Sequence, residues 1–262
     1  MDGDHRERRT SRTDAWVTSR PPEDAAEHRR RTREAYDRLA PVWSDATDDG
    51  PFNGGLERPA LRSLIPRPIA GARILDAGCG SGGQCRWLIE QGAEVAGVDL
   101  SPGMIEETSR RCGGRGSFHV ADLAGPLPLD TGTFDGITCS LVLHYLEDWA
   151  PTLASFARIL KEGGWAVVSL DHPFGLTGSD PGRSYFDKHL VGDRWVKGGV
   201  EVTQFFWHRT LADTVQAFAE GGFVVERVLE PQPSPELLAR FPEELADVDG
   251  APWFAVYRLL LK

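Results

Sequence analysis

Three acidic residues and one glycine-rich turn are the groups in this sequence whose spacing predicts chemistry. The turn starts at Asp76, which follows a short apolar run, and continues with glycines that include Gly78 and Gly80. Asp99 and Asp122 each end a later apolar run. Glycines allow a sharp turn and a close approach of a ligand to the backbone. A carboxylate at the end of the second strand can accept hydrogen bonds from both hydroxyl groups of a ribose. The pattern therefore predicts a site for an adenosine-containing cofactor.

The type of cofactor depends on the acidic residues rather than on the glycines. The spacing G-x-G-x-x-G, followed by Asp99, matches the dinucleotide fingerprint, so an NAD enzyme is one alternative. However, Asp76 directly precedes the glycines, and its carboxylate would repel a pyrophosphate at the helix N-terminus. A carboxylate there suits a cationic or amino-acid ligand, and Asp122 suits the amino group of an adenine. These residues therefore favour an adenosine cofactor that carries an amino-acid end.

Two histidines follow strands at the same predicted edge and are candidate general bases. His172 comes directly after the expected strand 165–170, and His144 comes shortly after the expected strand 134–140. Open α/β sheets bind ligands beyond the carboxyl ends of their strands, and a histidine titrates near neutral pH. His172 is the first candidate and His144 the second, although a single histidine more often has a structural role.

The elements that must position these groups alternate between strand and helix. Apolar runs at 72–77, 93–98, 116–121, 134–140 and 165–170 predict five strands, and helical patterns occur at 82–91, 102–112 and 150–160. This alternation predicts a parallel sheet covered by helices on both faces. A helix is then expected at 210–220, with strands at 223–229 and 252–261. Because no helix separates these last two strands, they are expected to form an antiparallel pair at a sheet edge.

The ends of this alternation define the expected domain organisation. Residues 1–26 are polar and charged and are expected to be a disordered or loosely ordered tail. Residues 27–262 are expected to form one domain, with N-terminal helices at 23–39 and 56–64 and with Pro41 ending the first of them. Residues 171–209 have no clear period and are expected to form an irregular lid over the substrate. Their aromatic residues predict an apolar or aromatic acceptor, although some of them would only anchor the lid. The residues assigned to acceptor binding are Phe174, Tyr185, Trp195, Phe206, Trp207 and His208.

Composition excludes several classes of protein. The 262 residues carry a net charge of −10, which disfavours a polyanionic partner such as nucleic acid. The four cysteines form no C-x-x-C pair and accompany no histidine cluster, so neither a disulfide framework nor a metal site is expected. No apolar run approaches the length of a membrane span, and no apolar leader precedes the domain. We therefore expect a cytoplasmic protein; its oligomeric state is left open by the sequence.

Several motifs together resemble the class I S-adenosylmethionine-dependent methyltransferases over about residues 34–230. They are Asp-Ala-Gly-Cys-Gly-Ser-Gly at 76–82, Val-Asp-Leu-Ser at 98–101, Ala-Asp-Leu at 121–123, Phe-Asp at 134–135 and Leu-Lys-x-Gly-Gly at 160–164. The resemblance implies a three-layer, Rossmann-like α/β fold. Its seven-stranded sheet would have the order 3-2-1-4-5-7-6, with strand 7 antiparallel. It also implies that S-adenosylmethionine is bound and leaves as S-adenosylhomocysteine.

The resemblance also assigns roles within the cofactor site. Asp76 would orient the methionine end, together with the backbone at Gly78 and Gly80, and Asp99 would bind the ribose. The remaining residues that the resemblance places at the cofactor are Leu100 and Met104 against the adenine, Asp122 and Leu123 at its amino group, Ser140 beside the methionine portion, and Tyr36 and Trp43 on a lid. Core packing is the alternative for Leu100 and Met104, and packing of the N-terminal helices onto the sheet is the alternative for Tyr36 and Trp43.

The function implied is direct transfer of a methyl group to a small apolar or aromatic molecule, of the kind found among bacterial natural-product enzymes. The methylated atom, whether oxygen, nitrogen or carbon, is left open. Sequences typical of amide, adenine or cytosine methyltransferases do not occur, and no metal constellation is evident. A cyclase or isomerase that binds the same cofactor without net methyl transfer is the alternative function.

Overall fold

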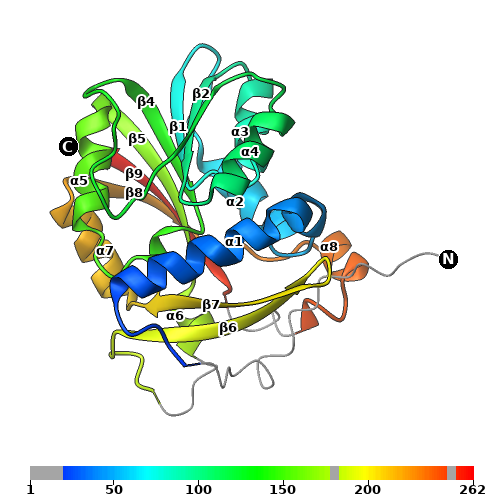
Figure 1. The fold of residues 1–262 in the computed structure, drawn as a ribbon. Coiled ribbons are helices and arrows are strands. Elements are labelled where there is room, and N and C mark those ends of the chain that lie inside the picture. Colours follow the sequence, from blue (N-terminus) through cyan, green and yellow to red (C-terminus); the bar gives the residue numbers. More distant parts are fainter. Residues whose placement is uncertain (1–19, 178–182, 247–251) are drawn as a thin grey trace.

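The computed structural model describes residues 20–177, 183–246 and 252–262, and its centre is a seven-stranded sheet (Figure 1). The strands lie in the order β3-β2-β1-β4-β5-β9-β8. Strand β9 runs antiparallel to both β5 and β8, and the other pairs are parallel. The numbers differ from the expected order because β6 and β7 form a separate two-stranded sheet. The bounds of the seven strands are β1 Arg73–Ala77, β2 Glu94–Asp99, β3 Ser117–Val120, β4 Phe134–Ser140, β5 Leu160–Asp171, β8 Phe223–Leu229 and β9 Phe254–Leu261.

Helices cover both faces of this sheet, as the sequence predicts (Figure 1). One face carries α2 (Arg58–Leu64), α3 (Gly83–Glu90) and α4 (Pro102–Arg111), and the other carries α5 (Ala150–Ile159) and α7 (Leu211–Glu220). Successive side chains of a strand point to opposite faces. Accordingly, Ile74 packs with the core beneath α2 and α3, whereas Leu75 packs with the core beneath α5 and α7.

The first helix extends beyond the end that Pro41 predicts. Helix α1 runs from Ala25 to Thr47 with Pro41 inside it, and the side chain of Asp24 caps its N-terminus. A proline removes one helical hydrogen bond. Here Trp43 and Thr47 are buried beyond the proline, and the packing of this last part offsets that loss. Figure 1 shows α1 crossing between the main sheet and the small sheet of β6 and β7. Residues 1–19 of the expected tail lie outside the described residues.

The segment expected to be an irregular lid contains regular structure instead. Short helix α6 (Pro173–Thr177) precedes strands β6 (His189–Lys197) and β7 (Val200–His208), which pair along their whole length. Gly198 and Gly199 connect them with φ angles of 54° and 79°, the region that two-residue hairpin turns require. The period was hidden because the buried face of this hairpin includes polar side chains such as Asp193 and Gln204, whereas the other face includes apolar ones such as Val196. Residues 178–182 of the expected lid lie outside the described residues.

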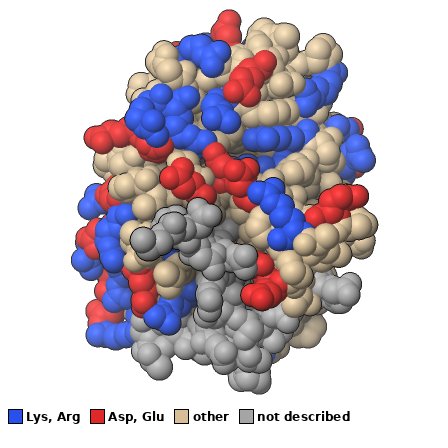
Figure 2. All heavy atoms as spheres, turned by 90° about the vertical axis from the view of Figure 1, so that its right-hand side faces the viewer, with Lys and Arg blue, Asp and Glu red and all other residues tan. Residues whose placement is uncertain are grey.

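The surface of the molecule shows charges of both signs. On the face that Figure 2 shows, basic and acidic side chains are interspersed among the residues drawn in colour. The described residues contain no helix that is long and apolar enough to cross a membrane. A short helix, α8 (Pro235–Arg240), a π-helical turn at Asn53–Glu57 and a 3-10 turn at Leu143–Tyr145 are the remaining described elements.

Candidate active site

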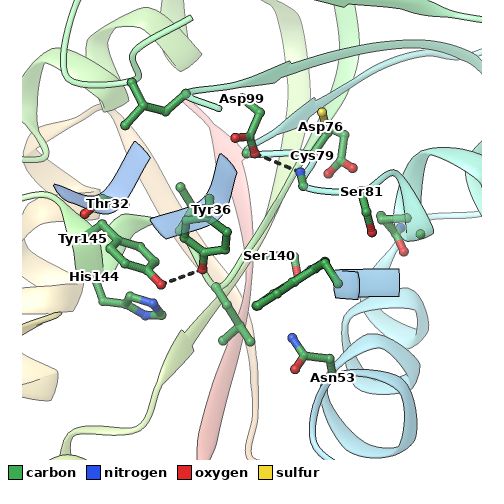
Figure 3. A pocket seen from close by; sticks show the side chains of 18 of the residues that line it. Thr32, Tyr36, Asn53, Asp76, Cys79, Ser81, Asp99, Ser140, His144 and Tyr145 are labelled. Atoms are coloured by element: carbon green, nitrogen blue, oxygen red, sulfur yellow. Dashed lines mark hydrogen bonds between the residues drawn. The ribbon is translucent and has the colours of Figure 1, made fainter. Parts of the chain in front are cut away.

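A cavity opens at the carboxyl ends of the central strands and brings most of the predicted cofactor residues together. Figure 3 shows Asp76 and Asp99 at one end of it and Tyr36, Tyr145 and His144 at the other. The predicted residues that line it are Tyr36, Trp43, Asp76, Gly78, Gly80, Asp99, Leu100, Asp122, Leu123, Ser140, His144, Trp195 and Phe206. Residues that are far apart in the sequence thus line one cavity.

The glycine turn has the geometry that only glycines adopt at low cost. Gly78 and Gly80 have φ angles of 78° and 51°. A Cβ atom on Gly78 would lie 2.3 Å from a methyl carbon of Val142, so any side chain there would collide with the wall beyond β4. The turn therefore exposes backbone to the cavity where a ligand can approach it closely.

The carboxylate of Asp99 holds the same turn from the next strand. Its two oxygens accept hydrogen bonds from the backbone N–H groups of Gly80 and Ser101, each at 2.9 Å. Burial raises the pKa of this carboxyl group, while the two backbone donors oppose the rise. Each carboxylate oxygen can accept a further hydrogen bond. Asp99 can therefore receive both hydroxyl groups of a ribose while it fixes the glycine turn.

Asp76 is buried at the floor of the cavity. Its carboxyl group accepts hydrogen bonds from the hydroxyl group of Thr138 at 2.7 Å and from the thiol of Cys85 at 3.2 Å. Burial raises its pKa to about 6, and the carboxyl group of Glu57 adds to the rise. A buried carboxylate of this kind is stabilised by a cationic ligand group, which lowers its pKa again.

Asp122 lines the same cavity and contacts helix α1. One oxygen accepts from the backbone of Ala124 at 2.9 Å, and the other lies 3.2 Å from Nε of Arg29. Both side chains of this ion pair are partly exposed. Asp122 is therefore available at the place where the adenine amino group is expected, beside a charge on α1.

Helix α1 forms one side of the cavity. The carboxylate of Asp37 accepts from the hydroxyl group of Ser101 at 2.6 Å and from the backbone of Gly103 at 3.1 Å, which fixes α1 to the start of α4. The hydroxyl groups of Tyr36 and Tyr145 are 2.6 Å apart. Burial raises the pKa of both tyrosines, so both remain neutral hydrogen-bonding groups.

Aromatic rings from α1, the hairpin and the turn after β4 line the cavity, and one of them, Trp43, lies beside the glycine turn, since a Cβ atom on Gly80 would be 3.9 Å from its Nε1 atom. Tyr36 contacts Trp43 edge-on at 5.2 Å between ring centroids and Tyr145 at 5.8 Å. Phe206 contacts Tyr145 at 4.9 Å and Trp195 at 5.7 Å. The hairpin supplies Trp195 and Phe206, and α1 supplies Tyr36 and Trp43. We call these five rings the aromatic chamber.

The structure brings His144, and not His172, to this chamber. The Nδ1 atom of His144 lies 3.8 Å from a carboxylate oxygen of Asp171, which also lines the cavity. His172 is fully buried, and its Nε2 atom lies 2.9 Å from the carboxylate of Glu230. Burial lowers the pKa of His172. His172 is not among the described residues that line the cavity, because the chain turns into α6 directly after β5.

Other predicted site residues also lie away from the cavity. Met104 is fully buried beneath α1 in a core cluster with Leu39 and Ala40. The ring of Phe174 stacks on Tyr185 and is half exposed. Lys188 lies over the ring of Trp207. The predicted residues that are absent from the described lining are Met104, His172, Phe174, Tyr185, Trp207 and His208.

Sequence reasoning missed several residues that line the cavity. Arg58 extends over the start of α3 and donates a hydrogen bond of 2.7 Å to Asp48. Tyr145 and Asp171 were each one residue from a predicted histidine. The sequence alone does not indicate which side chains of a helix or turn face a cavity. The missed lining residues with polar side chains are Thr32, Asn53, Arg58, Ser81, Gln84, Tyr145, Asp171 and Lys197.

Known proteins are similar to this chain in sequence and in fold. Residues 75–168 match a family profile described as a methyltransferase domain. The solved structure of an S-adenosylmethionine-dependent methyltransferase from Mesorhizobium loti is 33% identical in sequence, with a TM-score of 0.66. The match covers 78% of this chain and 97% of that one. The chain belongs to the class I S-adenosylmethionine-dependent methyltransferases.

Curated relatives of this methyltransferase include enzymes named for quinones. A demethylmenaquinone methyltransferase of Clavibacter sepedonicus is 37% identical over 136 residues, which are 51% of this chain and 52% of the relative. A ubiquinone biosynthesis O-methyltransferase of Xanthomonas oryzae pv. oryzae is 34% identical over 147 residues, which are 50% of this chain and 56% of the relative. The methyltransferase thus matches about half the length of each of these relatives.

S-adenosylmethionine is the cofactor of this family, and the cavity fits it. The two oxygens of Asp99 retain acceptor capacity for the ribose, and the glycine turn leaves space that a Cβ atom would fill. Asp76 supplies a buried negative charge for the cationic end. The described residues contain no group of three or more metal-binding side chains.

Proposed function

We propose that this methyltransferase transfers the methyl group of S-adenosylmethionine to a hydroxyl group of a small aromatic acceptor. The observation that carries the proposal is the aromatic chamber, which continues from the cofactor residues in the same cavity. Flat apolar walls with a few polar groups favour an aromatic ring, and the ammonium group of Lys197, over the rings of Trp43 and Trp195, is a charged group among them. The chamber therefore suits a phenol or a quinol.

Two hydroxyl groups at the rim of the chamber support an acceptor with a polar substituent. The paired hydroxyl groups of Tyr36 and Tyr145 can donate to, or accept from, an acceptor oxygen, because each retains unused hydrogen-bonding capacity. Such contacts orient the acceptor toward the methyl group, and orientation is a large part of catalysis by direct displacement.

His144 is the group that takes the acceptor proton in this proposal. A phenol is a weak nucleophile until its proton is removed, and a histidine beside a carboxylate is suited to remove it. When bound, the cofactor supplies a methyl group on a sulfonium, which is a good leaving group. His144 would take the proton of the acceptor hydroxyl group, which leaves an oxygen nucleophile for the methyl group that the bound cofactor would supply. Asp171 stabilises the imidazolium that results.

The hairpin of β6 and β7 is the acceptor lid in this proposal. It supplies Trp195 and Phe206 to the chamber, and it contacts α1 through the carbonyl oxygen of Phe205, which accepts from Nε2 of His28 at 2.8 Å. Closing the chamber excludes water from the reacting atoms. The ubiquinone biosynthesis O-methyltransferase among the relatives supports a hydroxyl group as the methyl acceptor.

The test is a turnover assay with S-adenosylmethionine and a panel of phenols, quinols, aromatic amines and aliphatic alcohols. We expect methylated product and S-adenosylhomocysteine to form in equal amounts from the phenols or quinols. Turnover of the amines alone would refute the choice of oxygen. Product formed without S-adenosylhomocysteine would favour a cyclase or isomerase. In the His144→Ala variant turnover should fall, whereas the exposed His119→Ala variant serves as the matched control.

A further inference from the structure

Glu57 is a buried carboxyl group that the reaction proposed above does not use. It ends a single π-helical turn, Asn53–Glu57, and lies directly before α2 with no exposed surface. Such turns are rare and often mark functional sites. This one is held tightly, because a Cβ atom on Gly54 would meet the backbone of Asp48 and one on Gly55 would lie 2.5 Å from Leu237.

The hydrogen bonds of Glu57 are unevenly distributed between its two oxygens. Oε1 accepts from the hydroxyl group of Ser140 at 2.9 Å and from that of Ser169 at 2.5 Å. Oε2 is buried and has no hydrogen-bond partner among the described residues. An unsatisfied buried carboxylate oxygen is costly for folding, so stability alone does not account for this group.

The two serines connect Glu57 to a strained wall of the cofactor site. The backbone N–H of Leu141 donates to the side-chain oxygen of Ser169 at 3.0 Å and to its carbonyl oxygen at 3.1 Å. Leu141 has a φ angle of 55° and is the only non-glycine with a positive φ in the described part of the chain. Such a conformation is strained for a residue with a side chain and persists only when its surroundings hold it. Ser140 and Leu141 both line the cavity.

The same carboxyl group lies near the buried charge on the cavity floor. Ser140, which donates to Glu57, and Thr138, which donates to Asp76, are two residues apart on the same face of β4, so the two carboxyl groups are neighbours, and Glu57 adds to the rise in the pKa of Asp76. Burial raises the pKa of Glu57 itself, while the hydroxyl groups of Ser169 and Ser140 and the charges of Arg58 and Arg62 oppose the rise. A cation bound in the cavity therefore favours the ionised form of Glu57, because opposite charges stabilise each other in a desolvated site.

We propose that Glu57 is a positioning residue of the cofactor site: it holds the Ser140–Leu141 wall through two serine hydroxyl groups and makes the site prefer the cationic S-adenosylmethionine to the neutral S-adenosylhomocysteine. The product lacks the sulfonium charge but retains the rest of the cofactor. Glu57 lies one hydroxyl group behind the wall, and its ionised form, which the sulfonium favours and the neutral product does not, distinguishes the two. This inference rests on the cofactor and is independent of the acceptor.

The test measures binding by calorimetry with each cofactor form alone, without any acceptor. In the Glu57→Gln variant the amide oxygen can still accept from both serines, but the charge is lost. We expect its affinity for S-adenosylmethionine to fall about tenfold relative to its affinity for S-adenosylhomocysteine, as the loss of one partly screened charge predicts. The Glu57→Asp variant retains the charge and should keep the wild-type ratio of the two affinities.

The Ser169→Ala variant tests the positioning role separately. Without the bridge to Leu141, both affinities should fall by a similar factor of about five, equivalent to one hydrogen bond. The exposed Glu94→Gln variant is the matched control and should bind both forms as the wild type does. Equal effects of Glu57→Gln on the two affinities, or no effect, would overturn the charge role. If that variant does not fold, unchanged binding by Ser169→Ala overturns the proposal and weakened binding of both forms supports it.

Discussion

Replacing Asp76 by asparagine should make the cofactor-free protein more stable and the cofactor complex weaker. The asparagine oxygen can still accept from Thr138, and the thiol of Cys85 loses only a weak bond. The change removes the cost of keeping a charge buried. That cost follows from the pKa of Asp76, which burial raises from its ordinary value of 3.8 to about 6. The difference corresponds to about 3 kcal/mol of unfolding free energy above pH 6.

The sign of the pH dependence provides the sharper test. Because the folded state holds the proton of Asp76 more tightly than the unfolded state does, this cost is present above pH 6 and disappears as the pH falls toward 3.8. Between pH 7.5 and pH 5 the wild type should therefore recover about 1.4 kcal/mol relative to the variant. Urea unfolding at the two pH values, without cofactor, measures this difference. The exposed Asp130→Asn variant should show no such recovery.

The binding half of this prediction uses the same variant. Loss of the charge that faces the cationic end of the cofactor should weaken S-adenosylmethionine binding about 10- to 100-fold, the range for one hydrogen bond to a charged group. A variant that is less stable than the wild type at pH 7.5 would contradict the buried-charge argument. A variant that binds the cofactor normally would remove Asp76 from the site.

Three further predictions concern the wall of the cavity and the two histidines. His144→Ala should lower kcat at least 100-fold with a phenolic acceptor, as steady-state kinetics would measure. His172→Ala should retain turnover but lose about 1–3 kcal/mol of stability, because its buried hydrogen bonds are lost, and thermal melting would measure this loss. Tyr145→Phe should raise the acceptor KM about fivefold, the effect of one hydrogen bond, and leave cofactor affinity unchanged by calorimetry. Gly78→Ala should abolish cofactor binding, because the added Cβ atom would meet Val142 at 2.3 Å. Circular dichroism should show that this variant retains the fold.

The sequence predicts the central sheet, and most of the residues that it assigns to the cofactor line one cavity. The apolar runs predict where the strands lie. Because parallel strands end at one edge of the sheet, they also predict that Asp76, Asp99 and Asp122, which end these runs, meet at that edge. These are local signals, and each is complete within a few residues. The structure accordingly brings these three aspartates to one cavity.

The acceptor end depends on contacts that no local pattern contains. His172 and His144 are equivalent in sequence, since each follows a strand, and only the turn into α6 separates them. The helix through Pro41 persists because Trp43 packs beyond it, which a propensity argument cannot anticipate. No local pattern marks Glu57 as buried, because a glutamate in a helical stretch is expected to be exposed and its serine partners are more than 80 residues away.

Helix α1 connects the two ligand sites, and this has a consequence for how they communicate. At the adenosine end Asp37 and Arg29 attach it to α4 and to Asp122, and at the acceptor end Tyr36 and His28 attach it to Tyr145 and to the hairpin. A ligand that shifts α1 at one end therefore acts on the contacts at its other end. Any resulting change in affinity is reciprocal, so the cofactor alters acceptor binding by the same factor as the acceptor alters cofactor binding.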